Sequence, residues 1–211
     1  MQNLTPEKAL EILEEARKLN PKGWIEHSIN VGKAAKKIAE ALGEDADKAE
    51  SFGYIHDIGR RVGKCSLSHT IEGYKYLKEL GYDDAARICL THGFMENSVE
   101  GAFGQWDMPD EEKEFVKDYV EKTQLNIYDK IIQLADCIAL PSGITTIERR
   151  MADVCLRYGF DEYTEGNLKE RLTVQHEIEE KLGYSIFKLF KEEVIENLEN
   201  NKTKDVYSFL K

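Results

Sequence analysis

Apolar positions recur every three to four residues along most of the chain, which is the period of an amphipathic helix. Capping and breaking residues punctuate this pattern: Thr5-Pro6-Glu7 can open the first helix, and Asn20-Pro21-Lys22-Gly23 can end it. Strand signals are weak, and no clear hairpin turn separates alternating β-branched runs. The pattern predicts helices over about 5–19, 24–42, 45–58, 69–80, 83–92, 110–122, 126–140, 144–158, 164–182 and 185–200.

These segments predict an all-α fold, a single-domain helical bundle over residues 1–211. A chain of this length suits one compact domain with a sizeable core, and no internal repeat divides it. The segment 93–109 has no period but carries Phe94, Phe103 and Trp106. A loop of this length acts either as a lid or binding loop or as a surface excursion pinned by aromatic residues, and the sequence leaves both open.

Charge and composition narrow the function. Lys and Arg number 29 and Asp and Glu 40, so the net charge is −11. This balance argues against extended nucleic acid as a partner and leaves room for a small anionic substrate. No apolar run approaches the roughly 18–20 residues that span a bilayer, and the N-terminus lacks a signal-peptide pattern. We therefore expect a cytoplasmic protein without a membrane partner. The cysteines form no closely spaced pair and are predicted to be small core residues: Cys65, Cys89, Cys137 and Cys155.

Four of the five histidines fall on apolar helix faces. His27, for example, lies three residues after Trp24 and four before Val31, so it faces inward. One such histidine is usually a hydrogen-bonded core residue. The same spacing, however, places further groups inward from other helices: His56, Asp57, His69 and His92.

Asp136 adds a carboxylate to a helix that is apolar around most of its circumference. An ionised carboxylate in a buried helix is costly unless a cation or metal pairs with it, and no Lys or Arg is adjacent in the sequence. His176 differs, because it lies among Gln175, Glu177 and Glu179, and we expect it at the surface.

A shared metal centre explains these inward groups together. Four imidazoles and two carboxylates are too many for one tetrahedral zinc, and they suit two divalent cations of about six-coordination with Asp57 bridging. Nitrogen and oxygen ligands without thiolate favour iron or manganese, with zinc or magnesium also compatible. The predicted ligands are His27, His56, Asp57, His69, His92 and Asp136.

The order of these residues resembles the H…HD…D signature of the HD-domain superfamily of metal-dependent phosphohydrolases. The segment 56–59 reads His-Asp-Ile-Gly, which matches the HDIG form of the motif, and His69 and His92 resemble the extra pair of dinuclear members. The resemblance covers an HD-like core of about 24–150, on which we expect helices of about 160–211 to pack. Many members carry Lys after this motif, whereas Arg60 and Arg61 follow here, which changes the geometry but keeps the charge.

The resemblance implies a metal-dependent phosphohydrolase that cleaves a phosphate ester or anhydride of a nucleotide-like small molecule. It implies attack by a hydroxide held between two metals, with Asp57 as the catalytic residue that bridges them and positions the hydroxide. His27, His56 and Asp136 would complete one metal, with His69 and His92 on the other.

A phosphorylated substrate also needs cations beside the metals. Arg60, Arg61 and Lys64 follow the motif in a glycine-punctuated turn, and Arg149 and Arg150 form a second candidate pair. For each of these cations, an ordinary solvated surface position is the alternative. The sequence does not determine the oligomeric state, and a homodimer is compatible with it.

Two other functions remain open. Some HD-fold proteins hold two irons in a similar ligand set and use dioxygen on a polyol or phosphonate, and the ligands alone do not exclude that reaction. A catalytically silent metal-binding or regulatory domain is the third reading, against which the complete ligand set argues. The neighbouring cations favour hydrolysis.

Overall fold

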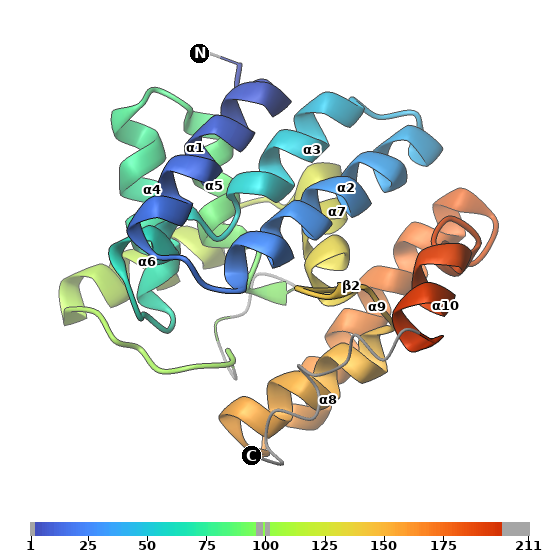
Figure 1. Cartoon of the computed structure of the whole chain (residues 1–211). Helices are drawn as coiled ribbons and strands as arrows, with labels where there is room; N and C mark the ends of the chain where they lie inside the picture. The colour runs from blue at the N-terminus through green and yellow to red at the C-terminus, as the bar shows by residue number, and fades with distance from the viewer. Residues whose placement is uncertain (1–2, 96–98, 100–101, 200–211) are drawn as a thin grey trace.

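A computed structural model describes residues 3–95, 99 and 102–199 of the chain (Figure 1). The all-α prediction is confirmed: within this part the structure has ten α-helices, short 3-10 turns and one two-stranded hairpin. The α-helices are α1 (Pro6–Leu19), α2 (Trp24–Leu42), α3 (Ala46–Ile55), α4 (Ser68–Glu79), α5 (Asp83–Thr91), α6 (Asp110–Lys122), α7 (Ile127–Cys137), α8 (Ile147–Tyr158), α9 (Thr164–Leu182) and α10 (Lys191–Glu199). The remaining elements are η1 (Ile58–Val62), η3 (Ile186–Lys188), β1 (Ala139–Leu140) and β2 (Gly143–Ile144).

Local sequence explains where several helices begin and end. Thr5 accepts a hydrogen bond from the Lys8 amide at 3.3 Å at the start of α1, and Gly43 takes a left-handed conformation after α2. Asn126 and Asp129 form a reciprocal capping box at the start of α7. These ends agree with the sequence pattern to within about two residues.

The predicted helix over 45–58 is wrong at its end. α3 stops at Ile55, and the chain turns at His56 and Asp57 before the 3-10 helix η1. A close contact accounts for the turn, because a Cβ on Gly59 would stand 1.9 Å from the backbone oxygen of His69. Only glycine therefore lets η1 lie against α4. His56 and Asp57 lie in the turn that precedes this contact.

The sequence pattern also missed the hairpin at 139–144. Ala139 pairs with Ile144 and Leu140 with Gly143 in antiparallel register, and Gly143 has a φ of +135°. The side-chain amide of Asn30 donates to the Leu140 carbonyl at 2.8 Å and ties the hairpin to α2. Apolar runs this short do not distinguish helix from strand by period, so α7 was predicted too long. Likewise, the helix predicted over 185–200 is the short η3 followed by α10.

The core forms around α2 and α3, which cross closely. A Cβ on Gly53 would lie 2.5 Å from the Gly32 Cα, so two facing glycines permit this approach. Residues such as Ile38 and Ile55 are fully buried there, and α7 covers the inner side of the pair with Ile131 and its neighbours. The result is a rigid centre to which the site-bearing turns attach.

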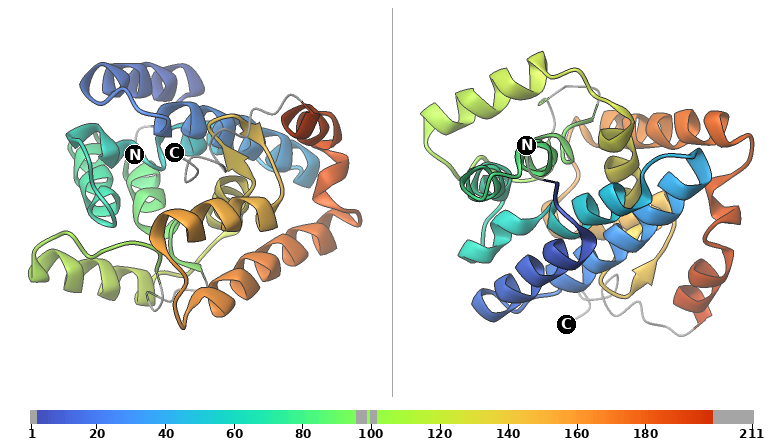
Figure 2. Two further views of the ribbon diagram at one scale, coloured as in Figure 1. Left: turned by 60° about the horizontal axis from the view of Figure 1, so that its bottom comes forward. Right: turned by 90° about the horizontal axis from the view of Figure 1, so that it is seen from above.

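The C-terminal helices lie on one side of the molecule, across from α4 and α6 (Figures 1 and 2). α9 packs against α7 and buries Val174 and Ile178, while α8 contacts both α7 and α9. This arrangement brings one face of α8 to the ends of α2 and α7. Within the described ranges, every helix is too short or too polar to span a lipid bilayer.

Candidate metal centre

Five separate elements deliver the predicted ligands to one place. His27 comes from the first turn of α2, and the His56–Asp57 turn follows α3. His69 lies in the first turn of α4 and His92 directly after α5. Asp136 lies in the last turn of α7. Residues that are up to 109 positions apart in the sequence thus meet at one end of the bundle.

Asp57 belongs to two potential ligand groups. One group is His27, His56 and Asp57, the other is Asp57, His69 and His92, and within each group the ligand atoms lie within 4.8 Å of one another. The Asp57 Oδ1 atom is 3.0 Å from His69 Nε2 and 3.7 Å from His92 Nε2. Its Oδ2 atom lies on the side of His56, 3.9 Å from that Nε2. The carboxylate therefore presents one oxygen to each group.

Asp136 stands beside the first group. Its Oδ1 atom is 2.9 Å from His27 Nε2 and 3.7 Å from Arg150 Nη2. The side chain keeps 22% of its surface exposed, so the expectation that this carboxylate is buried is wrong. The cation comes from α8, which the sequence does not place near α7.

Backbone carbonyls orient the imidazoles. The Nδ1 atom of His56 lies 2.8 Å from the Gly53 oxygen, and that of His92 lies 3.1 Å from the Ile88 oxygen. His69 contacts the Ser66 oxygen in the same way. A carbonyl only accepts, so each Nδ1 carries the proton and each Nε2 offers a lone pair.

The chemistry of these donors fits a divalent cation. His56 Nε2 is buried and has no hydrogen-bond partner, although an unpartnered polar atom in the interior is costly. Burial lowers the pKa of His56 to about 3 and also lowers the pKa of His69, so both rings are neutral at pH 7. For His92, burial acts in the same direction, but its contacts with Asp57 raise the pKa above the usual value.

The carboxylates are held ionised. Burial by itself would raise the pKa of Asp57, but the Arg60 guanidinium and His69 together lower it well below its usual range. Arg60 Nε donates to Asp57 Oδ2 at 2.7 Å. Burial is likewise outweighed at Asp136, whose pKa is lowered by the hydrogen bond from His27 and by Arg150. Ionised carboxylates and neutral imidazoles are the forms that bind metal.

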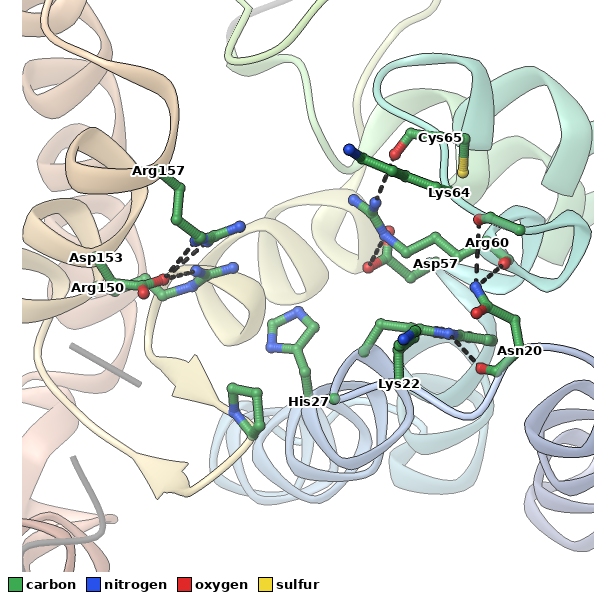
Figure 3. A pocket seen from close by; sticks show the side chains of 14 residues that line it. Asn20, Lys22, His27, Asp57, Arg60, Lys64, Cys65, Arg150, Asp153 and Arg157 are labelled. Carbon is green, nitrogen blue, oxygen red and sulfur yellow. Dashed lines mark hydrogen bonds and ion pairs between the residues drawn. The ribbon is translucent and has the colours of Figure 1, made fainter. Parts of the chain in front are cut away.

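A cavity of about 620 Å³ opens onto this centre (Figure 3). Arg60 and Lys64 lie on one side of it and Arg150 and Arg157 on the other, with His27 between them. A second, smaller cavity reaches the ligands His69, His92 and Asp136. The residues that line the larger cavity are Asn20, Lys22, Gly23, Trp24, His27, Asp57, Arg60, Gly63, Lys64, Cys65, Pro141, Arg150, Asp153 and Arg157.

The structure separates the predicted substrate residues into two sets. Arg60, Lys64 and Arg150 line the cavity at the centre. Arg61 instead places its guanidinium over the Tyr76 ring, 4.1 Å from the ring centroid. Arg149 lines neither cavity at the centre, and its backbone amide donates to the Thr146 cap of α8. Arg60 and Arg150 thus line the cavity, whereas the adjacent Arg61 and Arg149 do not.

Sequence reasoning missed Asp153, Arg157 and Arg171. Asp153 and Arg157 follow Arg150 by three and seven residues on α8, so the helical period could have placed all three on one face. Arg171 reaches the smaller cavity from α9, with its guanidinium 5.2 Å from the Phe103 ring centroid. No sequence signal links α9 to the site.

The described part of segment 93–109 is held against the protein. Phe94 stacks on Trp106 with ring centroids 6.0 Å apart, and the Asp107 carboxylate accepts from the Ser66 and Ser68 amides at 2.6 and 2.8 Å. These contacts pin the segment against the protein, and Phe103 of the same segment also lines the smaller cavity at the centre. Residues 96–98 and 100–101 of the segment lie outside the described residues.

One further prediction is confirmed, and another is confirmed in part. His176 is exposed on α9, as expected, and it lines neither of the two cavities at the centre. All four cysteines are free thiols, and Cys89, Cys137 and Cys155 are buried as predicted. The prediction of a core position is wrong for Cys65, which is half-buried and lines the larger cavity.

Parts of the chain are similar to known proteins. A sequence model of the HD domain family matches residues 24–140. Ribonuclease Y of Enterococcus faecalis is 40% identical over 75 residues, which are 36% of this chain and 12% of that protein. Ribonuclease Y of Fusobacterium nucleatum subsp. nucleatum is 33% identical over 78 residues, 36% of this chain and 15% of that protein. No solved structure gives a significant match.

The extent of these matches determines what they establish. This chain matches only 12 to 15% of the length of these two relatives, so the ribonuclease activity in their names is a property of those proteins and is not transferred to this chain. The family model, in contrast, covers more than half of the chain and includes the His56–Asp57 doublet. Because this match coincides with an all-α fold that gathers the H…HD…D residues at one site, the chain belongs to the HD domain family of metal-dependent phosphohydrolases.

Proposed function

We propose that this protein hydrolyses a phosphate ester or anhydride bond of a small, nucleotide-like molecule at a centre of two divalent cations. The position of Asp57 carries the proposal, because its two carboxylate oxygens face two different ligand groups. A carboxylate shared in this way is the expected bridge of a dinuclear centre.

His27, His56, Asp57 and Asp136 would hold one cation, and Asp57, His69 and His92 the other. The donor set of imidazole and carboxylate groups without thiolate favours iron or manganese. Two such cations supply Lewis-acid polarisation of the phosphoryl oxygens and activation of water.

The protein's own groups orient and neutralise the reactants. Arg60 fixes the Asp57 carboxylate through its Nε–H, while Lys64 at the same side of the cavity attracts phosphate oxygens. In the net reaction an oxygen–phosphorus bond forms from water, the bond to the leaving oxygen breaks, and the water protons pass to the two products or to solvent.

The cavity and the charge support a small substrate. Although the matched relatives are named ribonucleases, the net charge of −11 opposes the broad phosphate contacts that bind extended RNA. A cavity of about 620 Å³ is in the range of small-molecule sites.

Elemental analysis of protein purified without added metal, followed by phosphate-release assays on a panel of phosphorylated metabolites, tests the proposal. We expect two metal ions per chain and hydrolysis of at least one nucleotide-like compound. Oxygen consumption with a polyol or phosphonate, without phosphate release, would instead establish the oxygenase reaction. Protein that takes up no metal would identify a silent domain.

Asp57→Ala should release metal and abolish turnover, because it removes a ligand from both groups. His176→Ala is the matched control: this exposed residue should leave metal content and turnover unchanged. Retention of two tightly bound metal ions by Asp57→Ala would contradict the bridging role.

A further inference from the structure

One face of α8 carries a preformed pair of guanidinium groups. Asp153 Oδ2 accepts from Arg150 Nη1 at 2.9 Å and from Arg157 Nη2 at 2.8 Å. The Asp153 side chain is only 8% exposed, so this carboxylate is a fixed anchor beneath both arginines. The single carboxylate of Asp153 thus holds both guanidinium groups at the cavity wall.

This cluster extends outward from the metal centre. Arg150 Nη2 lies 3.7 Å from the ligand Asp136, which places Arg150 at the inner end. Its side chain is 17% exposed, whereas that of Arg157 is 43% exposed and forms the outer end. Both arginines line the larger and the smaller cavity, so any molecule that extends from the centre along this wall passes them in turn.

The opposite wall carries its own cations. Arg60 and Lys64 face the α8 cluster across the cavity (Figure 3), and Arg60 is held by Asp57 and the Cys65 carbonyl. Among the described lining residues there are five Lys or Arg and two Asp, although the whole chain has a net charge of −11. A cationic cavity within an acidic protein concentrates small anions.

The α8 cluster also lies outside the segment that the family model matches, which ends at residue 140. We propose that Arg150 and Arg157, anchored by Asp153, form a second anion subsite, and that the substrate therefore carries another phosphate group beyond the one that is hydrolysed. The substrate class is a nucleoside diphosphate or a comparable bisphosphorylated small molecule, not a simple phosphomonoester. This inference rests on the proposed function for the identity of the scissile group, but the subsite itself is a binding property.

Calorimetric titration of the manganese-loaded protein tests it with two matched pairs of probes. The pairs are adenosine 5′-(α,β-methylene)diphosphate with adenosine 5′-monophosphate, and glucose 1,6-bisphosphate with glucose 6-phosphate. In the unsubstituted protein, the probe with two phosphates should bind at least about tenfold more tightly than its partner, because a charge-assisted hydrogen bond contributes that much.

Arg157→Gln should weaken the two-phosphate probes about tenfold and the single-phosphate probes less than twofold, with metal content unchanged. For Arg157→Lys, the affinity for the two-phosphate probes should lie between those of the unsubstituted protein and Arg157→Gln, because lysine keeps the charge but lacks the planar guanidinium group. Lys169→Gln removes one exposed charge from α9 and should change neither affinity. Elemental analysis and a melting curve of each variant verify that the protein is folded and loaded.

If Arg157→Gln lost affinity equally for both members of a pair, or lost none for the two-phosphate probes, the proposed subsite would be overturned. Binding without discrimination by the unsubstituted protein would overturn it as well. Failure of the proposed function gives a different result. The protein would still bind the two-phosphate probes more tightly than their partners, and Arg157→Gln would still reduce that difference, but no phosphorylated compound would be hydrolysed.

Discussion

At the residue scale, the same few side chains serve both the centre and the cavity. Asp57 faces two ligand groups and also accepts from Arg60, so that residue links the metal ligands to the cationic wall. Three of the histidines, His56, His69 and His92, are prepared for metal by backbone carbonyls that hold the Nδ1 proton. Neighbouring cations in the chain have different surroundings: Lys64 lines the cavity, whereas Arg61 stacks on Tyr76.

Lys64→Ala should therefore raise KM for the hydrolysed compound several-fold while metal content stays the same, because the side chain lines the cavity without belonging to either ligand group. Steady-state kinetics with parallel elemental analysis measures both. An unchanged KM would remove Lys64 from the substrate site.

At the element scale, close contacts and buried polar networks position the turns that bear the ligands. Gly59 allows η1 to approach α4, and this contact fixes the doublet relative to His69. On the other side, α7 holds the turn after α5. Gln133 donates to the Thr91 and Phe94 carbonyls, each at 3.0 Å, and these carbonyls flank His92.

Gly59→Ala should lower the melting temperature and reduce metal content, since the new Cβ would stand 1.9 Å from the His69 oxygen and force η1 and α4 apart. Gly166→Ala in α9 is the matched control, because a Cβ there meets nothing within 4 Å. Alanine in a helix should leave the control as stable or about 1 kcal/mol more stable. Equal melting temperatures for the two variants would contradict the proposed contact.

Asp129 is a second structural test at this scale. It is fully buried on α7, and its carboxylate accepts from Arg87 Nη2 at 2.6 Å and from Thr91 Oγ1 at 2.7 Å. Asp129→Ala should lower the free energy of unfolding by roughly 3–5 kcal/mol, because it breaks a buried ion pair and removes an acceptor of the Thr91 hydroxyl. Urea denaturation measures this loss. A change below about 1 kcal/mol would show that the network contributes little.

At the scale of the whole molecule, the centre connects five elements that otherwise contact one another mainly through apolar packing. α2 and the turn after α3 supply one ligand group, and the first turn of α4 and the residue after α5 complete the other. α8 and α9 add Arg150, Arg157 and Arg171 to the lining of the smaller cavity, and all three lie outside the residues 24–140 that the family model matches. Bound cations should therefore stabilise the whole fold.

Removal of metal by a chelator should lower the melting temperature. Ligand at a hundredfold excess over its dissociation constant contributes about 2.7 kcal/mol, which corresponds to roughly 5–10 °C for a protein of this size. Differential scanning calorimetry before and after chelation measures the shift. Asp57→Ala should melt at the same temperature with and without chelator, and a full shift in that variant would place the metal elsewhere.

The sequence by itself determined the helical class and the inward-facing ligands, because helical period and cap residues act locally and because a buried His or Asp needs a partner. The end of α3 and the hairpin after α7 depended on contacts with distant segments, such as the Gly59 approach to His69 and the bond from Asn30 to Leu140. Tertiary structure alone decided which cations face the centre. Adjacent residues on a helix point in different directions, so Arg150 reaches Asp136 while Arg149 does not line the cavity. Arg171 joins the site only because α9 folds back over α7.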